Sequence, residues 1–114
     1  MRASRTLVLA VAVLAWIVVL SAVPATGAGP DGKALFLAQK CNLCHSVEPA
    51  GIERTSKSEK MKGPDLAGVA KRHDAEWTKK FLTKTEMLNG KKHLKEFKGT
   101  PEELDALVAW LGKQ

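Results

Sequence analysis

Two thiols and an imidazole lie close together in the middle of the chain. Cys41 and Cys44 are separated by two residues, and His45 follows directly. Cysteines at this spacing can each add to one of two neighbouring vinyl groups of a porphyrin, and the next residue then lies where its imidazole can bind the iron. The C-x-x-C-H motif therefore predicts one haem c, attached covalently through Cys41 and Cys44 and ligated by His45.

Two other chemistries use a C-x-x-C pair. A redox-active dithiol of the thioredoxin type lies next to a βαβ pattern, which this sequence does not show. A zinc site needs further cysteines or paired histidines, whereas His73 and His93 are each isolated. A structural dithiol protein without haem and a haem sensor with an open sixth position remain the alternatives. The chain has no nucleophile–base set, phosphate-binding loop or paired acids, so we expect no enzyme.

The first 28 residues differ in character from the rest. Two arginines precede the unbroken apolar run 7–20, and small residues follow. This order is typical of a secretory signal peptide, cleaved after Ala25 or Ala28. An N-terminal anchor that is not cleaved is the alternative, because the segment is uncharged after its second arginine. We therefore expect residues 1–28 to direct export to the periplasm and residues 29–114 to form the functional domain.

The remainder is small, basic and poor in large apolar side chains. At 114 residues the whole chain has room for one domain. Two of its 18 Lys and Arg residues and none of its 12 Asp and Glu residues lie in the first 28 positions, which leaves a net charge of +4. Only three Phe and two Trp remain to build a core, which predicts that a bound prosthetic group completes it. Export excludes nucleic acid as a partner.

Helical signals lie on both sides of the motif. Asp31 is a typical N-cap for a helix in which Gly32 and Phe36 share one face. Residues 100–103 read Thr-Pro-Glu-Glu, which predicts a capping box with proline at the first helical position. An apolar stripe follows at helical spacing, formed by Leu104, Leu107, Val108 and Leu111. Gly112 is the expected C′ residue of that helix.

A third helix is expected between these two. Asp74 is its N-cap, and Trp77 and Phe81 share one face. Residues 52–60 are polar and charged and predict a surface loop. There is no strand-like alternation and no internal repeat, so the predicted fold class is all-α.

With these elements in place, residues 31–112 resemble the class I cytochrome c family. Gly32 and Phe36 match the N-terminal helix of that family, in which glycine allows close crossing by the C-terminal helix. Leu107 and Trp110 match the leucine and the aromatic residue of the partner helix. The resemblance implies a cytochrome c-like helical fold around one covalent haem, with the N- and C-terminal helices crossing.

The resemblance extends to the segment after the motif. Gly63-Pro64-Asp65-Leu66 is similar to the family's Gly-Pro-x-Leu, which implies that the Pro64 carbonyl accepts the second N–H of His45 and raises its basicity. Two departures are visible. The loop between His45 and Gly63 is longer than in mitochondrial members, and the stretch from Leu66 to the C-terminal helix is much shorter. The shorter stretch implies a trimmed bacterial domain with a more exposed haem edge.

Family members also supply a sixth iron ligand, normally a methionine. Met61 lies on the proximal side of the family pattern, and His73 lies between charged neighbours, so Met87 and His93 remain. Aligned without gaps to mitochondrial cytochrome c from the C-terminal helix, His93 falls at the position of the axial methionine, and Met87 lies too early. We expect the iron to be bound by His45 and His93, with Met87 as the alternative ligand and an open site as the third case.

The function implied by the resemblance is one-electron transfer between redox partners in an exported compartment. A group of lysines lies in the segment expected to rim the distal haem edge: Lys79, Lys80, Lys84, Lys91, Lys92, Lys95 and Lys98. Such a rim is suited to redox protein partners with acidic docking surfaces, because opposite charges raise association rates. The carrier is either soluble in the periplasm or tethered there by its N-terminal segment.

Overall fold

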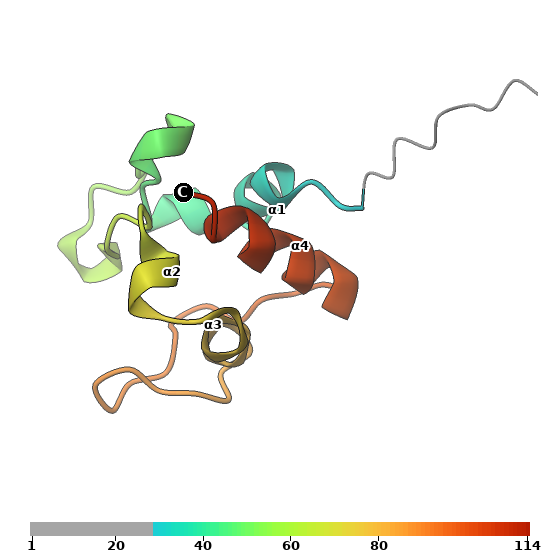
Figure 1. The fold of residues 1–114 in the computed structure, drawn as a ribbon. Coiled ribbons are helices and arrows are strands. Elements are labelled where there is room, and N and C mark those ends of the chain that lie inside the picture. Colours follow the sequence, from blue (N-terminus) through green and yellow to red (C-terminus); the bar gives the residue numbers. More distant parts are fainter. Residues whose placement is uncertain (1–28) are drawn as a thin grey trace, which may run out of the picture.

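The computed structural model describes residues 29–114, and the signal peptide or anchor predicted for residues 1–28 lies outside this range. The described chain forms short helices joined by long irregular segments (Figure 1). Its α-helices are α1 (Gly32–Ala38), α2 (Val69–Arg72), α3 (Ala75–Leu82) and α4 (Pro101–Leu111). Single 3₁₀ turns span Cys41–Leu43, Glu48–Ala50 and Glu59–Met61. Within residues 29–114 there is no strand, which agrees with the predicted all-α class.

Helices α1 and α4 come from opposite ends of the described chain and cross at its centre (Figure 1). The crossing is close because Gly32 has no side chain: a Cβ there would lie 2.2 Å from Trp110 Cβ and 2.6 Å from the Ala106 carbonyl oxygen. One turn later Phe36 packs against Trp110, with ring centres 5.4 Å apart. The predicted crossing of the terminal helices at Gly32 is confirmed.

The predicted N-caps are present at three of the helices. The Asp31 carboxylate accepts from two backbone N–H groups of the first turn of α1, at 3.0 and 3.4 Å. Asp74 caps α3, and Thr100 and Glu103 form the reciprocal capping box of α4. Each cap pairs backbone donors that have no partner within the helix. Local sequence signals therefore fix where α1, α3 and α4 begin.

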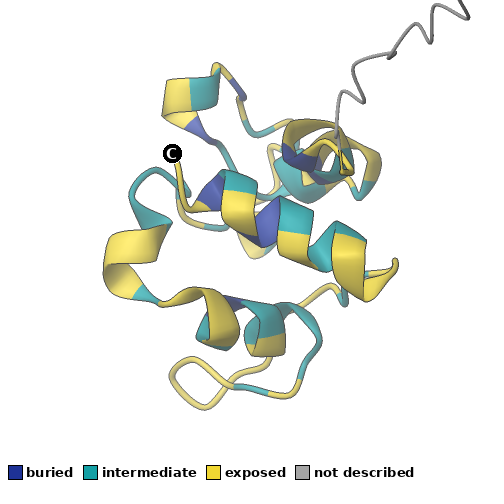
Figure 2. Ribbon diagram, turned by 45° about the vertical axis from the view of Figure 1, so that its right-hand side comes forward, coloured by how far each residue is buried: buried dark blue, intermediate teal, exposed yellow. Residues whose placement is uncertain are grey.

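The core is small and lies where α4 faces α1 and the segment after the C-x-x-C-H motif. Its buried apolar side chains are Phe36, Val47, Ile52, Leu107, Val108 and Leu111. Figure 2 shows the buried positions as dark blue stretches of the ribbon. The expectation of a surface loop over residues 52–60 is therefore wrong at its first residue. Ile52 pairs with Val47 in an isolated antiparallel β-bridge, and the turn between them directs both side chains into the core. The rest of that segment is exposed or half-buried.

Two further details differ from the sequence-based expectations. The four-residue helix α2 was not anticipated; it begins after Gly68, whose φ of +68° is left-handed. Gly112 ends α4 with an ordinary right-handed φ of −64°, so it is not a left-handed C′ residue. Its amide still donates to the Val108 carbonyl at 2.9 Å. Gly112 therefore continues the helical bonding instead of reversing the chain.

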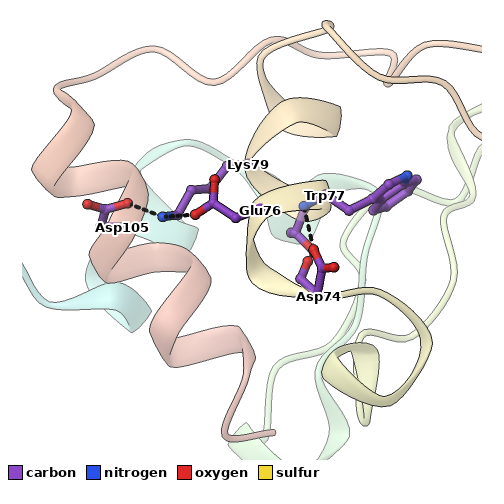
Figure 3. A network of polar contacts seen from close by, with 6 residues as sticks. Asp74, Glu76, Trp77, Lys79 and Asp105 are labelled. Carbon is purple, nitrogen blue, oxygen red and sulfur yellow. Dashed lines mark hydrogen bonds and ion pairs between the residues drawn. The ribbon is translucent and has the colours of Figure 1, made fainter.

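Helix α3 is attached to α4 by an ion pair. Lys79 Nζ lies 3.0 Å from a Glu76 carboxylate oxygen on its own helix and 2.7 Å from Asp105 on α4. Figure 3 shows Lys79 pointing toward α4 and Trp77 pointing to the other side of α3. On that side of α3 the Trp77 ring stacks on Phe81, which in turn meets His93 of the segment between α3 and α4. Among residues 29–114 no helix is both long and apolar enough to cross a bilayer.

Candidate functional site

The C-x-x-C-H motif lies two residues after α1 and is preceded by a left-handed residue. Lys40 has φ +57°, which turns the chain out of α1 and into the 3₁₀ turn Cys41–Leu43. The amides of Cys44 and His45 both donate to the Cys41 carbonyl, at 3.2 and 3.0 Å. Both cysteines are half-buried and are not joined in a disulfide, and burial raises the pKa of the Cys41 thiol. The turn thus presents both thiols and the imidazole from one compact segment.

The His45 ring is oriented by Gly63 and Pro64, which lie next to it in the fold. Its Nδ1 lies 2.7 Å from the Pro64 carbonyl oxygen. A Cβ at Gly63 would lie 2.3 Å from His45 Cε1, so only glycine leaves room for the ring. Burial lowers the pKa of His45, against the effect of the Pro64 bond, and so favours the neutral imidazole. With Nδ1 donating to a carbonyl, Nε2 is the nitrogen with a free lone pair.

A second histidine faces the first. The rings of His45 and His93 have centres 6.1 Å apart, and their planes are within 11° of parallel. The Nδ1 atom of His93 is hydrogen-bonded to the Lys95 carbonyl, so its Nε2 is also left with a free lone pair. The Phe81 ring meets the His93 ring edge-on, with centres 5.2 Å apart. In both imidazoles, which come from distant parts of the chain, Nδ1 is hydrogen-bonded to a backbone carbonyl and Nε2 is the nitrogen available to bind a metal ion.

The other candidate ligands lie in different surroundings. Met87 is 54% exposed. Met61 accepts a hydrogen bond from the Ser56 hydroxyl, at 3.7 Å. His73 stacks on Trp77 with ring centres 3.7 Å apart. None of these three side chains is paired with the His45 ring, whereas the His93 ring lies parallel to it with centres 6.1 Å apart.

Two residues with a structural part in the site were missed from the sequence. The Asp65 carboxylate accepts from the Ser46 hydroxyl at 2.6 Å and from the Glu48 and Ala67 amides at 3.2 and 2.7 Å. The Ala67 bond is a local Asx turn, a signal that the sequence does carry. Gln39 binds the backbone of Lys98, 59 residues later, and no local pattern predicts such a bond.

The lysines expected at the rim fall into two groups. Lys79 is held by two carboxylates, which raise its pKa, and it braces α3 against α4. Lys98 pairs with Glu96 at 2.9 Å. The remaining five are Lys80, Lys84, Lys91, Lys92 and Lys95, of which only Lys84 is half-buried and the rest are exposed. The rim is therefore smaller than the sequence suggested, because Lys79 belongs to the scaffold.

These donors suit a haem. A porphyrin supplies four nitrogen ligands to its iron, so a protein need add only one or two axial ligands and, in c-type proteins, two thiols. The described chain carries the thiols of Cys41 and Cys44 just before His45, and it places the His93 ring nearly parallel to the His45 ring with centres 6.1 Å apart. Its small core agrees with a fold in which a large apolar group completes the interior. The residues present therefore fit the group.

Comparison with known proteins gives one match. The family model described as Cytochrome c matches residues 30–114, which is all but one of the residues that the structure describes. No curated protein and no solved structure matches the chain. Family membership establishes the coarse function, a haem-binding electron carrier with haem c as its cofactor. The two cysteines, the crossing helices and the family match agree: the chain belongs to the cytochrome c family.

Proposed function

We propose that this protein is a monohaem one-electron carrier whose iron is bound by His45 and His93. In this proposal Cys41 and Cys44 attach the haem, Pro64 orients His45 through its carbonyl, and the iron alternates between its ferric and ferrous states. The observation that carries the proposal is the pair of parallel imidazoles, 6.1 Å apart, with both Nδ1 atoms bonded to backbone carbonyls.

The spacing of the rings supports axial ligation from two sides. Metal–imidazole bonds are about 2.0–2.1 Å long and a ring nitrogen lies about 1 Å from the ring centre, so two imidazoles on opposite sides of one metal ion have centres about 6 Å apart. The two Nδ1–carbonyl contacts support the same assignment, because they fix the tautomer that ligates through Nε2. The exposure of Met87 weighs against the alternative ligand.

The partners in this proposal are redox proteins with acidic docking surfaces. Exposed lysines gather on the segment between α3 and α4, which also carries His93: Lys91, Lys92 and Lys95. A basic rim beside the cofactor guides an acidic partner to the point where an electron can cross. The exported setting rests on residues 1–28, whose basic, apolar and small-residue order favours a periplasmic carrier, released or tethered by that segment.

Covalent haem attachment is the first expected result. Expressed with a cytochrome maturation system, the protein should retain its haem through acid–acetone extraction. Changing both Cys41 and Cys44 to serine should abolish this retention and leave the domain unfolded, because six buried apolar side chains are too few to hold it alone. A well-folded wild-type protein without haem would contradict the assignment.

Distal ligation is tested by three single variants. His93→Ala should convert the ferric spectrum from low-spin to high-spin, or make the iron bind added ligands, because one axial nitrogen is removed. Met87→Leu should leave the spectrum unchanged, and His73→Ala is the matched control for loss of an imidazole elsewhere. The oxidised wild type should also lack the weak near-infrared sulfur-to-iron band, and its potential should be low, since no thioether raises it. A high-spin Met87→Leu protein would assign the position to methionine instead.

A further inference from the structure

The segment that carries His93 has little regular structure of its own. Between α3 and α4 the described chain has one isolated β-bridge, Leu88 with Lys91, and left-handed backbone at Lys84, Asn89 and Gly90. A backbone bond of 2.9 Å from Phe97 to the Leu82 carbonyl ties the end of the segment to α3. Something else must hold residues 93–96, because neither of these bonds reaches them.

Gln39, the C-cap of α1, contacts this part of the chain at Lys95 and just beyond it at Lys98. Its side-chain amide donates to the Lys98 carbonyl, and its Oε1 accepts from the Lys98 amide at 3.2 Å. Its own backbone carbonyl accepts from the Lys95 ammonium group. The half-buried Gln39 thus contacts the segment between α3 and α4 at two residues, Lys95 and Lys98.

These contacts connect directly to the histidine. The Lys95 residue that donates to Gln39 through its side chain also offers its carbonyl to His93 Nδ1. The path from α1 to the imidazole therefore runs through Gln39, Lys95 and His93, all in hydrogen-bond contact. Gln39 also lies two residues before Cys41. The stretch that carries the thiols and the stretch that carries the second imidazole are thus tied at one residue, through the backbone carbonyl of Gln39 at Lys95 and through its side chain at Lys98.

We propose that Gln39 is a positioning residue for the distal ligand, holding the segment 95–98 against α1 so that His93 stays opposite His45. The inference rests on the proposed ligation by His93 and adds a residue outside the ligand set. Without the Gln39 amide the segment keeps the Phe97 bond to α3 and the Lys95 bond to the Gln39 backbone carbonyl, but it loses both bonds that fix Lys98 to α1. His93 should then leave the iron more often, while the fold defined by the α1–α4 crossing is retained.

The test measures how fast added imidazole binds to the ferric, haem-loaded protein at saturating imidazole. Under that condition the rate reports departure of the internal ligand. Gln39→Ala should raise this rate about tenfold, as expected for two lost hydrogen bonds at a half-buried site. The matched control is Lys33→Ala, which removes another long-range bond from α1, to the Ala50 carbonyl at 3.3 Å, in a different loop. Lys33→Ala should bind imidazole at the wild-type rate.

A second variant and a stability measurement keep the result specific. Gln39→Asn keeps the amide but shortens its reach, so it should also bind imidazole faster, even if the alanine protein folds poorly. Guanidinium unfolding should show Gln39→Asn within the range of Lys33→Ala, because the change is local. Equal imidazole rates in wild type and Gln39→Asn, or an equal acceleration in Lys33→Ala, would overturn the role of Gln39.

Failure of the ligand assignment has a different signature. A sulfur-to-iron band in the oxidised wild type would overturn ligation by His93, and the inference with it. A wild-type spectrum without that band, combined with unchanged rates in both Gln39 variants, would overturn only the positioning role.

Discussion

The Asp65 carboxylate joins the two segments that enclose His45. It accepts from Ser46, directly after His45, and from Ala67, just beyond Pro64. The Pro64 carbonyl that orients the imidazole is therefore held in place by its neighbour's side chain. The Ser46 hydroxyl is the main cause that keeps the pKa of Asp65 below its usual range, with the Ala67 amide next.

Ser46→Ala should destabilise the protein in a way that depends on pH. A carboxyl whose pKa is lowered by folding stabilises the native state above its unfolded pKa, and this contribution is lost as pH falls through the folded value. We expect the free energy of unfolding to fall by up to about 1 kcal/mol at pH 7. The difference between variant and wild type should become smaller below about pH 4, near the unfolded pKa of aspartate. Guanidinium unfolding of the haem-loaded protein across this range measures it.

The control for this prediction is Ser56→Ala. Ser56 is another half-buried serine, but its hydroxyl donates to the uncharged sulfur of Met61. Its effect on unfolding should therefore be the same at pH 7 and at acid pH. A Ser46→Ala effect equally independent of pH would show that the Asp65 carboxylate does not carry the stabilisation.

At the scale of elements, the α1–α4 crossing depends on a single missing side chain. Gly32→Ala places a methyl group where Trp110 Cβ and the Ala106 carbonyl already lie. Backbone and a Cβ atom cannot rotate away, so the helices must separate. We expect a loss of about 1–3 kcal/mol in the free energy of unfolding, the usual range for overpacking, measured by guanidinium titration of the haem-loaded protein.

Gly29→Ala is the matched control, because a Cβ at Gly29 meets nothing within 4 Å. It should leave the unfolding midpoint nearly unchanged. If both alanine variants unfolded at the same denaturant concentration, the close approach of α1 and α4 would not be a determinant of stability.

The elements that could be predicted are those with local signals. Asp31, Asp74 and the Thr100–Glu103 box each mark a helix start by side chains that cap nearby amides, so α1, α3 and α4 follow from the sequence. Helix α2 carries no such cap and is only four residues long. Its place depends on packing of Val69 against the core, which no short pattern encodes.

In the candidate site, too, only residues with a local sequence signal could be predicted directly. Cys41, Cys44 and His45 are predictable because haem attachment requires these residue types at this spacing along the chain. The facing of His93 toward His45 was expected only through alignment to a family. Gln39 was out of reach altogether, because its partner lies 59 residues away and glutamine at the end of a helix has many possible roles.

At the scale of the whole molecule, charge is the property that a partner meets first. Residues 29–114 carry a net charge of +4, and the exposed Lys91 and Lys92 lie on the segment that bears His93. Lys79 and Lys98 are engaged with carboxylates. Lys91 and Lys92 are thus exposed lysines beside His93 that are not engaged in an ion pair within the described residues.

Electron transfer with an acidic redox protein should therefore slow steeply as salt is added. The Debye length falls from about 30 Å at 0.01 M to about 10 Å at 0.1 M, so long-range attraction is lost over this range. Lys91→Glu/Lys92→Glu should lower the second-order rate severalfold at low salt, measured by stopped-flow spectroscopy. Lys57→Glu/Lys60→Glu, in a different exposed loop, provides an equal change of net charge. Identical rates for the two double variants would remove the distal lysines from the docking surface.

The crossing of α1 with α4 also bears on how fast the chain folds. The two helices lie at opposite ends of residues 29–114, so their pairing must close nearly the whole chain into a loop before it yields any stabilising contact. Closing such a loop costs conformational entropy at the outset, and chains dominated by distant contacts fold slowly for this reason. The entropy of closing this loop should therefore add to the folding barrier, whereas the short turns around residues 41–52 can form without closing such a loop.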